Sequence, residues 1–205
     1  MPGVKVTDKG ISFFDPGSIN VLGRAALEAF LVFHYVFIEP RSDDEKDFRY
    51  YLWLHASYND RQKFPSRSEE GKNQLANEKK IMDALKEKIN NNSVFKQFDK
   101  EKKKKLLKGE WSFQSWTNIG ISAGLSEILA KHFYSYLCIY AHSGCQSAQQ
   151  VGNAETSEIQ KALCFATMKL IMIAMANMIK VYCQMFVKSN DVLQKDEDAK
   201  KLIDQ

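Results

Sequence analysis

The positions of proline and glycine constrain the fold of this chain more than any other feature. All four prolines lie at or before residue 65, and only 10 of the 205 residues are glycine. A sheet would need turn residues at short intervals along the whole chain. The last two thirds are therefore expected to be mostly helical, and the sequence predicts an all-α protein.

Composition and patterning favour one folded domain, because 44% of the residues are hydrophobic and can bury a core. We expect an irregular N-terminal arm over residues 1–17 and a polar C-terminal extension over 189–205. Between them, residues 18–188 should form a bundle of about five to seven helices, the first capped by Ser18. A strongly apolar helix over 158–187 is predicted at the centre of this bundle.

The termini, charge and cysteines point to a cytoplasmic protein. The N-terminus has no secretory pattern, and the net charge of +4 does not demand a nucleic-acid partner. The four cysteines form no C-x-x-C motif and lie in apolar stretches, as free cysteines do in a reducing compartment; they are Cys138, Cys145, Cys164 and Cys183.

Residues 162–187 are apolar enough to require a membrane check. Lys169 and Lys180 interrupt the stretch, and a lysine in the middle of a bilayer is costly. We therefore expect a helix buried on most sides with one wet edge, and no membrane partner. The other basic feature, the run Lys102–Lys105, fits either a phosphate-binding patch or a solvated helix face.

The first candidate site lies on the first helix. Arg24, Glu28 and Tyr35 fall on one stripe of an otherwise apolar segment. Arg24 and Glu28 are four residues apart and can pair, as charges in such surroundings must. The pair is either a buried ion pair that fixes the register of the bundle or the wall of a ligand pocket.

The second candidate is the stretch YLCIYAHSGCQ at residues 136–146. Cys138, His142 and Cys145 face one way on a helix, but a zinc site would need a fourth ligand from elsewhere. We expect the cysteines to be small core residues and His142 to bond a partner on another helix. Glu28 and Tyr35 are natural partners, and Tyr136 adds a hydroxyl to the neighbourhood. No metal or cofactor is expected.

The third candidate is Arg49 with His55, because an arginine, five residues and a histidine fit the loose R-x(4–6)-H pattern of HEPN ribonucleases. In that family the pair is thought to cleave RNA without a metal ion. Here the two residues lie about 120° apart on a straight helix and do not converge unaided. The alternative is a solvated Arg49 and a His55 that packs among aromatic residues.

The order of these features resembles a bacterial family of all-helical domains of unknown function, number five-six-seven-seven. A more distant resemblance links the chain to HEPN-type helical domains. The first resemblance implies an all-helical fold and no particular activity. It is carried by Arg24 with Glu28, the aromatic-rich segment 48–64, Trp116, and the tyrosine-rich run that ends in His142-Ser143.

The sequence leaves three functions open, and it does not decide whether the protein is an enzyme. The leading hypothesis is a buried polar pocket that binds an anionic or nucleotide-like ligand, lined by Arg24, Glu28, Tyr35, Tyr136 and His142. The second is a metal-independent ribonuclease of a toxin or phage-defence system, acting on RNA through Arg24 and His142 or through Arg49 and His55. The third is an interaction module, for example a homodimer formed through Met168, Met172 and Met175.

Overall fold

The computed structural model describes residues 4–6 and 11–204, with side chains for residues 13–201 and 203. Helices dominate the described residues, which confirms the all-α prediction. The chain divides into two compact units: Met1–His34 together with Trp116–Gln205, and Tyr35–Ser115. The single bundle domain expected over 18–188 stays a prediction.

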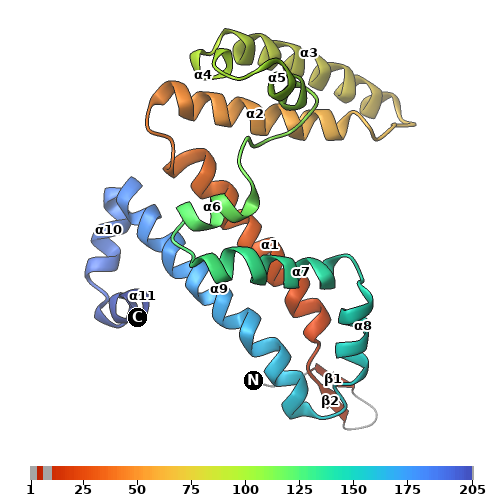
Figure 1. Cartoon of the computed structure of the whole chain (residues 1–205), viewed down its shortest axis with the longest axis vertical. Coiled ribbons are helices and arrows are strands. Elements are labelled where there is room, and N and C mark those ends of the chain that lie inside the picture. Colours follow the sequence, from red (N-terminus) through yellow and green to blue (C-terminus); the bar gives the residue numbers. More distant parts are fainter. Residues whose placement is uncertain (1–3, 7–10, 205) are drawn as a thin grey trace. The chain divides into compact units, whose positions relative to one another are not determined.

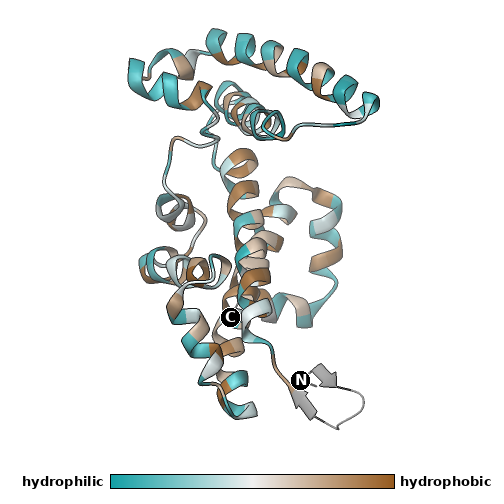
Figure 2. Cartoon of the chain, turned by 90° about the vertical axis from the view of Figure 1, so that its right-hand side faces the viewer, coloured by the Kyte–Doolittle hydropathy of each residue, from teal (hydrophilic) through white to brown (hydrophobic). Residues whose placement is uncertain are grey.

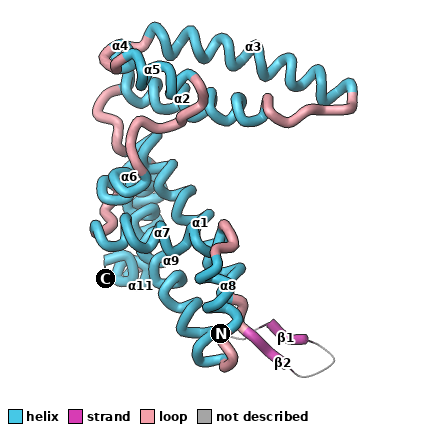
Figure 3. The backbone as a smooth tube through the Cα atoms, turned by 45° about the vertical axis from the view of Figure 1, so that its right-hand side comes forward, coloured by secondary structure: helices cyan, strands magenta, loops and turns pink. Residues whose placement is uncertain are grey.

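The first unit begins with a short antiparallel pair of strands inside the arm that was predicted as irregular. Strand β1 (Val4–Val6) pairs with β2 (Ile11–Phe13), as the magenta segments of Figure 3 show. Helix α1 (Pro16–Phe33) follows, capped by Asp15 instead of Ser18: the Ser18 N–H donates to Asp15 Oδ1 over 3.1 Å. Proline fits the first helical position because its missing N–H would have no partner there.

Helix α1 packs against both α9 and α7, and Figure 1 shows it beside α9. Glycine is required at position 23, where an added Cβ would lie 2.3 Å from Thr167 Cγ2 of α9. The buried Thr167 hydroxyl donates to Asn20 Oδ1 at the same crossing. The elements that complete this part of the unit are α6 (Trp116–Ser122), the π-helix η2 (Leu129–Phe133), α7 (Tyr134–Ala141), α8 (Cys145–Gly152) and α9 (Ser157–Met185).

The polar extension predicted over 189–205 folds back onto α9 as two helices. These are α10 (Val187–Gln194) and α11 (Glu197–Asp204), and both contact α9. Helix α9 is the longest in the described chain, yet only 22% of its most apolar window is buried. The prediction of a helix buried on most sides was therefore wrong, because most of α9 presents its side chains to solvent.

The second unit is a helical hairpin closed by short helices. It follows the π-helix η1 (His34–Ile38) and contains α2 (Asp43–Arg61), α3 (Glu69–Asn91), α4 (Ser93–Lys96) and α5 (Lys100–Leu107). Ser42 and Ser68 cap α2 and α3 by accepting from the N–H groups of Glu45 and Gly71. Both helices thus start where a serine precedes an acidic first turn.

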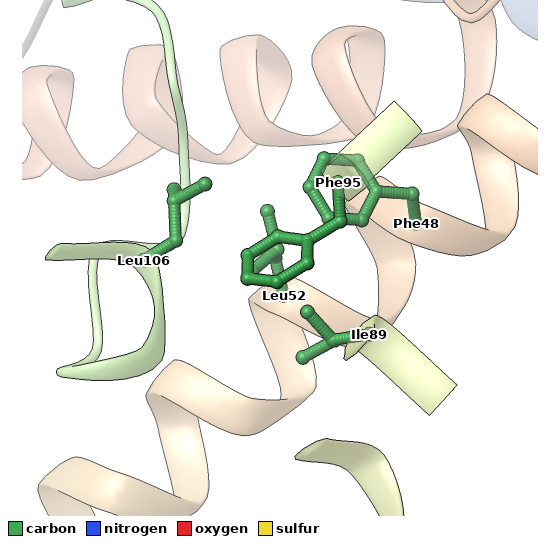
Figure 4. Close-up of a cluster of buried hydrophobic side chains, with 5 residues drawn as sticks. All are labelled: Phe48, Leu52, Ile89, Phe95 and Leu106. Atoms are coloured by element: carbon green, nitrogen blue, oxygen red, sulfur yellow. The ribbon is translucent and has the colours of Figure 1, made fainter. Parts of the chain in front are cut away.

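A compact apolar cluster holds the second unit together. Helix α3 is mostly hydrophilic in Figure 2, and only a thin stripe of it faces α2. That stripe supplies Ile89, which meets side chains from α2, α4 and α5 in the cluster of Figure 4. The five buried members are Phe48, Leu52, Ile89, Phe95 and Leu106.

Candidate functional site

Arg24 and Glu28 form the ion pair that their spacing predicts. Arg24 Nε donates to Glu28 Oε1 over 2.8 Å, and the two side chains are 21% and 29% exposed. The pair is therefore half-buried, whereas the sequence predicted a buried pocket. One edge of the guanidinium remains open to solvent.

His142 reaches this pair from the end of α7. Its Nε2 lies 3.3 Å from Arg24 Nη1, and the ring is exposed. Because a guanidinium can only donate, Nε2 must accept in this contact, and the ring proton then sits on Nδ1. Arg24 and His142, which are 118 residues apart in sequence, are thus brought together.

The turn that follows His142 fixes its position. Ser143 adopts a left-handed φ of 52°, and its N–H donates to Tyr140 O. The Gly144 N–H donates to Ile139 O over 2.8 Å. These two bonds form the Schellman arrangement that ends many helices, usually with glycine in the left-handed position. They hold His142 at the last turn of α7, over α1.

Tyr134 is the member of the cluster that the sequence reasoning missed. Its hydroxyl donates to Glu28 Oε1 over 2.9 Å, and Arg24 Cζ lies 5.8 Å from its ring centroid. Burial and the nearby Glu28 carboxylate raise the pKa of this tyrosine well above its ordinary value. The ring of Trp116 stacks on it at 5.4 Å. Positions 134 and 142 are eight residues apart, a spacing that could have identified Tyr134.

Tyr136 belongs to a different side of α7. Its hydroxyl donates to Tyr140, which in turn donates to Gln150 over 2.7 Å. Burial, together with Tyr136, raises the pKa of Tyr140 well above its ordinary value. The structure thus places Tyr136 in a tyrosine–glutamine chain and not beside Arg24.

Tyr35 also lies elsewhere, in the second unit. Its ring packs edge-on against Trp111 and Phe113, and its hydroxyl accepts from the Phe113 N–H. Burial raises the pKa of Tyr35 to about 12. Tyr35 lies eleven residues beyond Arg24, or about 16 Å along a helix, so sharing a stripe does not make the two residues neighbours.

Arg49 is the charged centre of the second unit. Its guanidinium donates to Tyr35 O over 2.8 Å, to Glu45 over 2.6 Å and to Glu39, and it lies 4.2 Å from the Tyr35 ring centroid. The residue is only 3% exposed. The sequence allowed a solvated Arg49, but the structure buries it between two carboxylates and two aromatic rings, the second of which is Phe113.

His55 is fully buried on another side of α2. Neither ring nitrogen has a hydrogen-bond partner. Burial lowers the pKa of this imidazole, as does the charge of Lys86, against a smaller opposing effect of Asp83. The hydrogen bonds of Arg49 go to Tyr35, Glu39 and Glu45, so the two residues of the R-x(4–6)-H pattern have separate environments.

The cysteines and the lysine run are the remaining candidates. The four cysteines are free, and no group of three or more His, Cys, Asp or Glu residues in the described part of the chain could hold a metal ion. The lysine run lies in α5, where Lys102 pairs with Glu110 and Lys103 donates to Lys96 O.

Among the residues that the structure describes, two helical segments are long and apolar enough to cross a membrane by length and composition, Pro16–Ile38 and Ser157–Met185. The core helices of a soluble protein pass the same test, so these segments leave the location of the protein open.

Comparison with known proteins gives a family and no activity. The model of a family of unknown function (DUF5677) matches residues 12–159, which is well over half of the chain. A search of curated proteins and a search of solved structures found no match. The resemblance to HEPN-type domains stays a prediction, whereas the other resemblance noted in the sequence is confirmed: the chain belongs to the family of unknown function DUF5677.

Proposed function

We propose that the cluster of Arg24, Glu28, Tyr134 and His142, called the α1–α7 cluster below, binds an anionic, nucleotide-like ligand. The observation that carries the proposal is the 3.3 Å contact between Arg24 Nη1 and His142 Nε2 at a solvent-open edge. Arginine offers a planar fork of donors that matches phosphate.

The aromatic pair beside the cluster supports the nucleotide-like part of the proposal. Trp116 and Tyr134 stack at 5.4 Å with an interplanar angle of 24°, and the Tyr134 hydroxyl ties this stack to Glu28. Aromatic faces stack on nucleobases with little regard to sequence. A phosphate at Arg24 and His142 with a base near Trp116 is the ligand chemistry that this arrangement fits best.

Calorimetric titration with inorganic phosphate and with AMP tests the proposal. Arg24→Gln or His142→Gln should weaken AMP binding about 10- to 100-fold, since a charge-assisted hydrogen bond contributes about 1.5–3 kcal/mol. His132→Gln is the matched control, because His132 is also exposed and lies just before α7. Wild-type protein that binds neither probe at millimolar concentration would overturn the proposal.

Glu28→Gln separates a ligand site from a purely structural ion pair. The substitution keeps the shape of the side chain and removes the negative charge that neutralises Arg24. A ligand site should then bind AMP more tightly, because the anion no longer competes with the carboxylate. A variant that only loses stability and gains no affinity would indicate that the pair merely holds α1 in place.

The same contact favours Arg24 with His142 over Arg49 with His55 for the ribonuclease hypothesis. His142 is exposed and touches Arg24, whereas His55 is fully buried. In such an enzyme the imidazole would exchange protons with the ribose 2′-hydroxyl, and the guanidinium would stabilise the phosphorane. Cleavage of a fluorescent RNA in the presence of a chelator, abolished by His142→Gln and retained by His132→Gln, would establish this activity.

The protein is proposed to act in the cytoplasm. Its four free cysteines support this, since unpaired cysteines persist in reducing compartments. Fractionation of cells that express the chain would place it in the soluble fraction; recovery with membranes would contradict the proposal.

A further inference from the structure

The longest helix carries a row of apolar side chains with the spacing of a coiled coil. Starting at residue 165, apolar residues recur at alternating steps of three and four through residue 186. These are the steps of a and d positions, which meet across a pair of helices. The row, called the α9 seam below, consists of Phe165, Met168, Met172, Met175, Ile179, Tyr182 and Phe186.

The α9 seam faces solvent, while a side of the helix about 110° around from it is packed inside the unit. Cys164, Thr167, Leu170 and Ala174 are buried, and Thr167 bonds to α1. Six of the seven seam residues are between 39% and 61% exposed, and Met168 is half-buried. The packing of α1 therefore leaves the seam uncovered, while α10 and α11 lie beside its C-terminal half.

We propose that the α9 seam is the interface through which the protein pairs with a second copy of itself. Its exposed area is about 600 Å² per chain, taking large side chains of about 200 Å² that are roughly half exposed. A stable interface buries about 800 Å² per partner, and about 600 Å² is at the upper end of the largest apolar patch on a typical monomer, which is often an interaction site. The seam alone thus supplies most of the area that a dimer needs, and its flanks would supply the rest.

Self-complementarity supports a second copy as the partner. Steps of three and four alternate from one end of the seam to the other, so the row keeps this alternation when it is read backwards. A two-fold dimer needs a surface that matches itself in this way. A lipid bilayer has no requirement for a 3.5-residue period, and Lys169 at the edge of the seam opposes burial in lipid.

The C-terminal half of the seam opens into a groove that can receive partner side chains. The groove has a volume of about 480 Å³ and lies between α9 and the two final helices. Met175, Ile179 and Tyr182 of the seam form one wall, and Val192 and Leu193 of α10 form part of the other. Helix α10 thus widens the apolar surface without covering the seam.

Two neighbouring substitutions test the proposal. Met172→Glu puts a charge in the middle of the seam, whereas Ile173→Glu puts the same charge one residue later, about 100° around the helix. Both side chains are exposed, 61% and 41%, so neither change should unfold the chain. Analytical ultracentrifugation of the full chain at 1–100 μM should show a dimer for wild type and Ile173→Glu.

The Met172→Glu variant should dissociate at least about 100-fold more readily, in line with the burial of a charge in an apolar interface. Circular dichroism would confirm that it is folded. A wild-type protein that is monomeric at 100 μM would overturn the proposal, as would equal weakening by both substitutions. Binding of the monomer to phosphatidylcholine vesicles, lost in Met172→Glu, would assign the seam to lipid and overturn it too.

Discussion

Removal of the Arg49 guanidinium should destabilise the protein far more than removal of the Arg24 guanidinium. Arg49 is 3% exposed and holds the carboxylates of Glu39 and Glu45, each only 20% exposed as a side chain. Arg24 holds one carboxylate at a half-buried site, where the Arg24 side chain is 21% exposed and that of Glu28 is 29% exposed. The two arginines therefore differ in how many charges each leaves unpaired when it is truncated.

The expected magnitudes follow from this geometry. Breaking a buried pair by deleting one partner costs about 3–5 kcal/mol, because an uncompensated charge stays in the interior. Since Glu39 and Glu45 retain some contact with water, Arg49→Ala should lower the free energy of unfolding by about 3 kcal/mol. Arg24→Ala should lower it by about 1 kcal/mol at most, as for solvent-accessible pairs.

Urea unfolding followed by tryptophan fluorescence provides the measurement. Trp111 lies 5.4 Å from the Tyr35 ring and so reports on the surroundings of Arg49. Arg49→Lys should fall between wild type and Arg49→Ala, because an ammonium keeps the charge and loses the fork that reaches both carboxylates. Equal losses for Arg49→Ala and Arg24→Ala would refute the assignment of Arg49 as the buried charge centre.

The pH dependence provides a second measurement on the same group. Burial alone would raise the pKa of Glu45, but the Arg41 N–H and the Arg49 guanidinium outweigh it and hold the pKa below 4.5. A lowered pKa in the folded state means that this stability is present above pH 4.5 and is lost as the pH falls through the folded value. Arg49→Ala should reduce that loss, and an unchanged acid profile would argue against the contact.

Three further predictions concern single positions. Stability should fall as the pH drops below 6.5, because the buried His55 has a lowered pKa and the unfolded chain binds the proton more tightly. The His55→Leu variant should therefore show a flatter dependence of the urea midpoint on pH between 7.5 and 5.5. A dependence as steep as that of wild type would contradict this. Gly23→Ala should lower the free energy of unfolding by about 1–3 kcal/mol in thermal unfolding, because the added Cβ would clash with α9. Gly152→Ala should change it by less than about 0.5 kcal/mol, because nothing lies within 4 Å of the added Cβ. Similar losses of stability in the two variants would rule out the close crossing of α1 and α9. Ser143→Gly should stabilise by about 1 kcal/mol in the same assay, since serine is strained at a φ of 52°, and a loss of stability would contradict this.

Local spacing predicted the parts of the site that depend on one helix. The i, i+4 relation of Arg24 to Glu28 holds because a helix over residues 16–33 brings those side chains together whatever surrounds it. For His142 the sequence named Glu28 and Tyr35 as hydrogen-bond partners, whereas the structure places its ring against Arg24.

Sharing one face of a helix did not predict a contact between residues that lie several turns apart. Tyr35 shares a stripe with Arg24, yet it lies three turns further on and packs with the second unit. Tyr136 precedes His142 by six residues, which turns it about 120° away, whereas Tyr134 lies within about 80° of His142. A prediction that had weighed both rotation and rise would have chosen Tyr134 as the tyrosine of the α1–α7 cluster.

Accessibility separates the two arginine–histidine pairs in chemical terms. A group that transfers protons to a polymer must be reached by it, and the imidazole of His55 has no exposed surface. Opening that site would expose part of the aromatic core of α2 and leave Arg49 tied to Glu39 and Glu45. His142 needs no such opening, because its ring is exposed and Arg24 already lies beside it. If the chain acts on a phosphodiester, the reaction is therefore expected at the end of α7, and His142→Gln is the substitution that should abolish it.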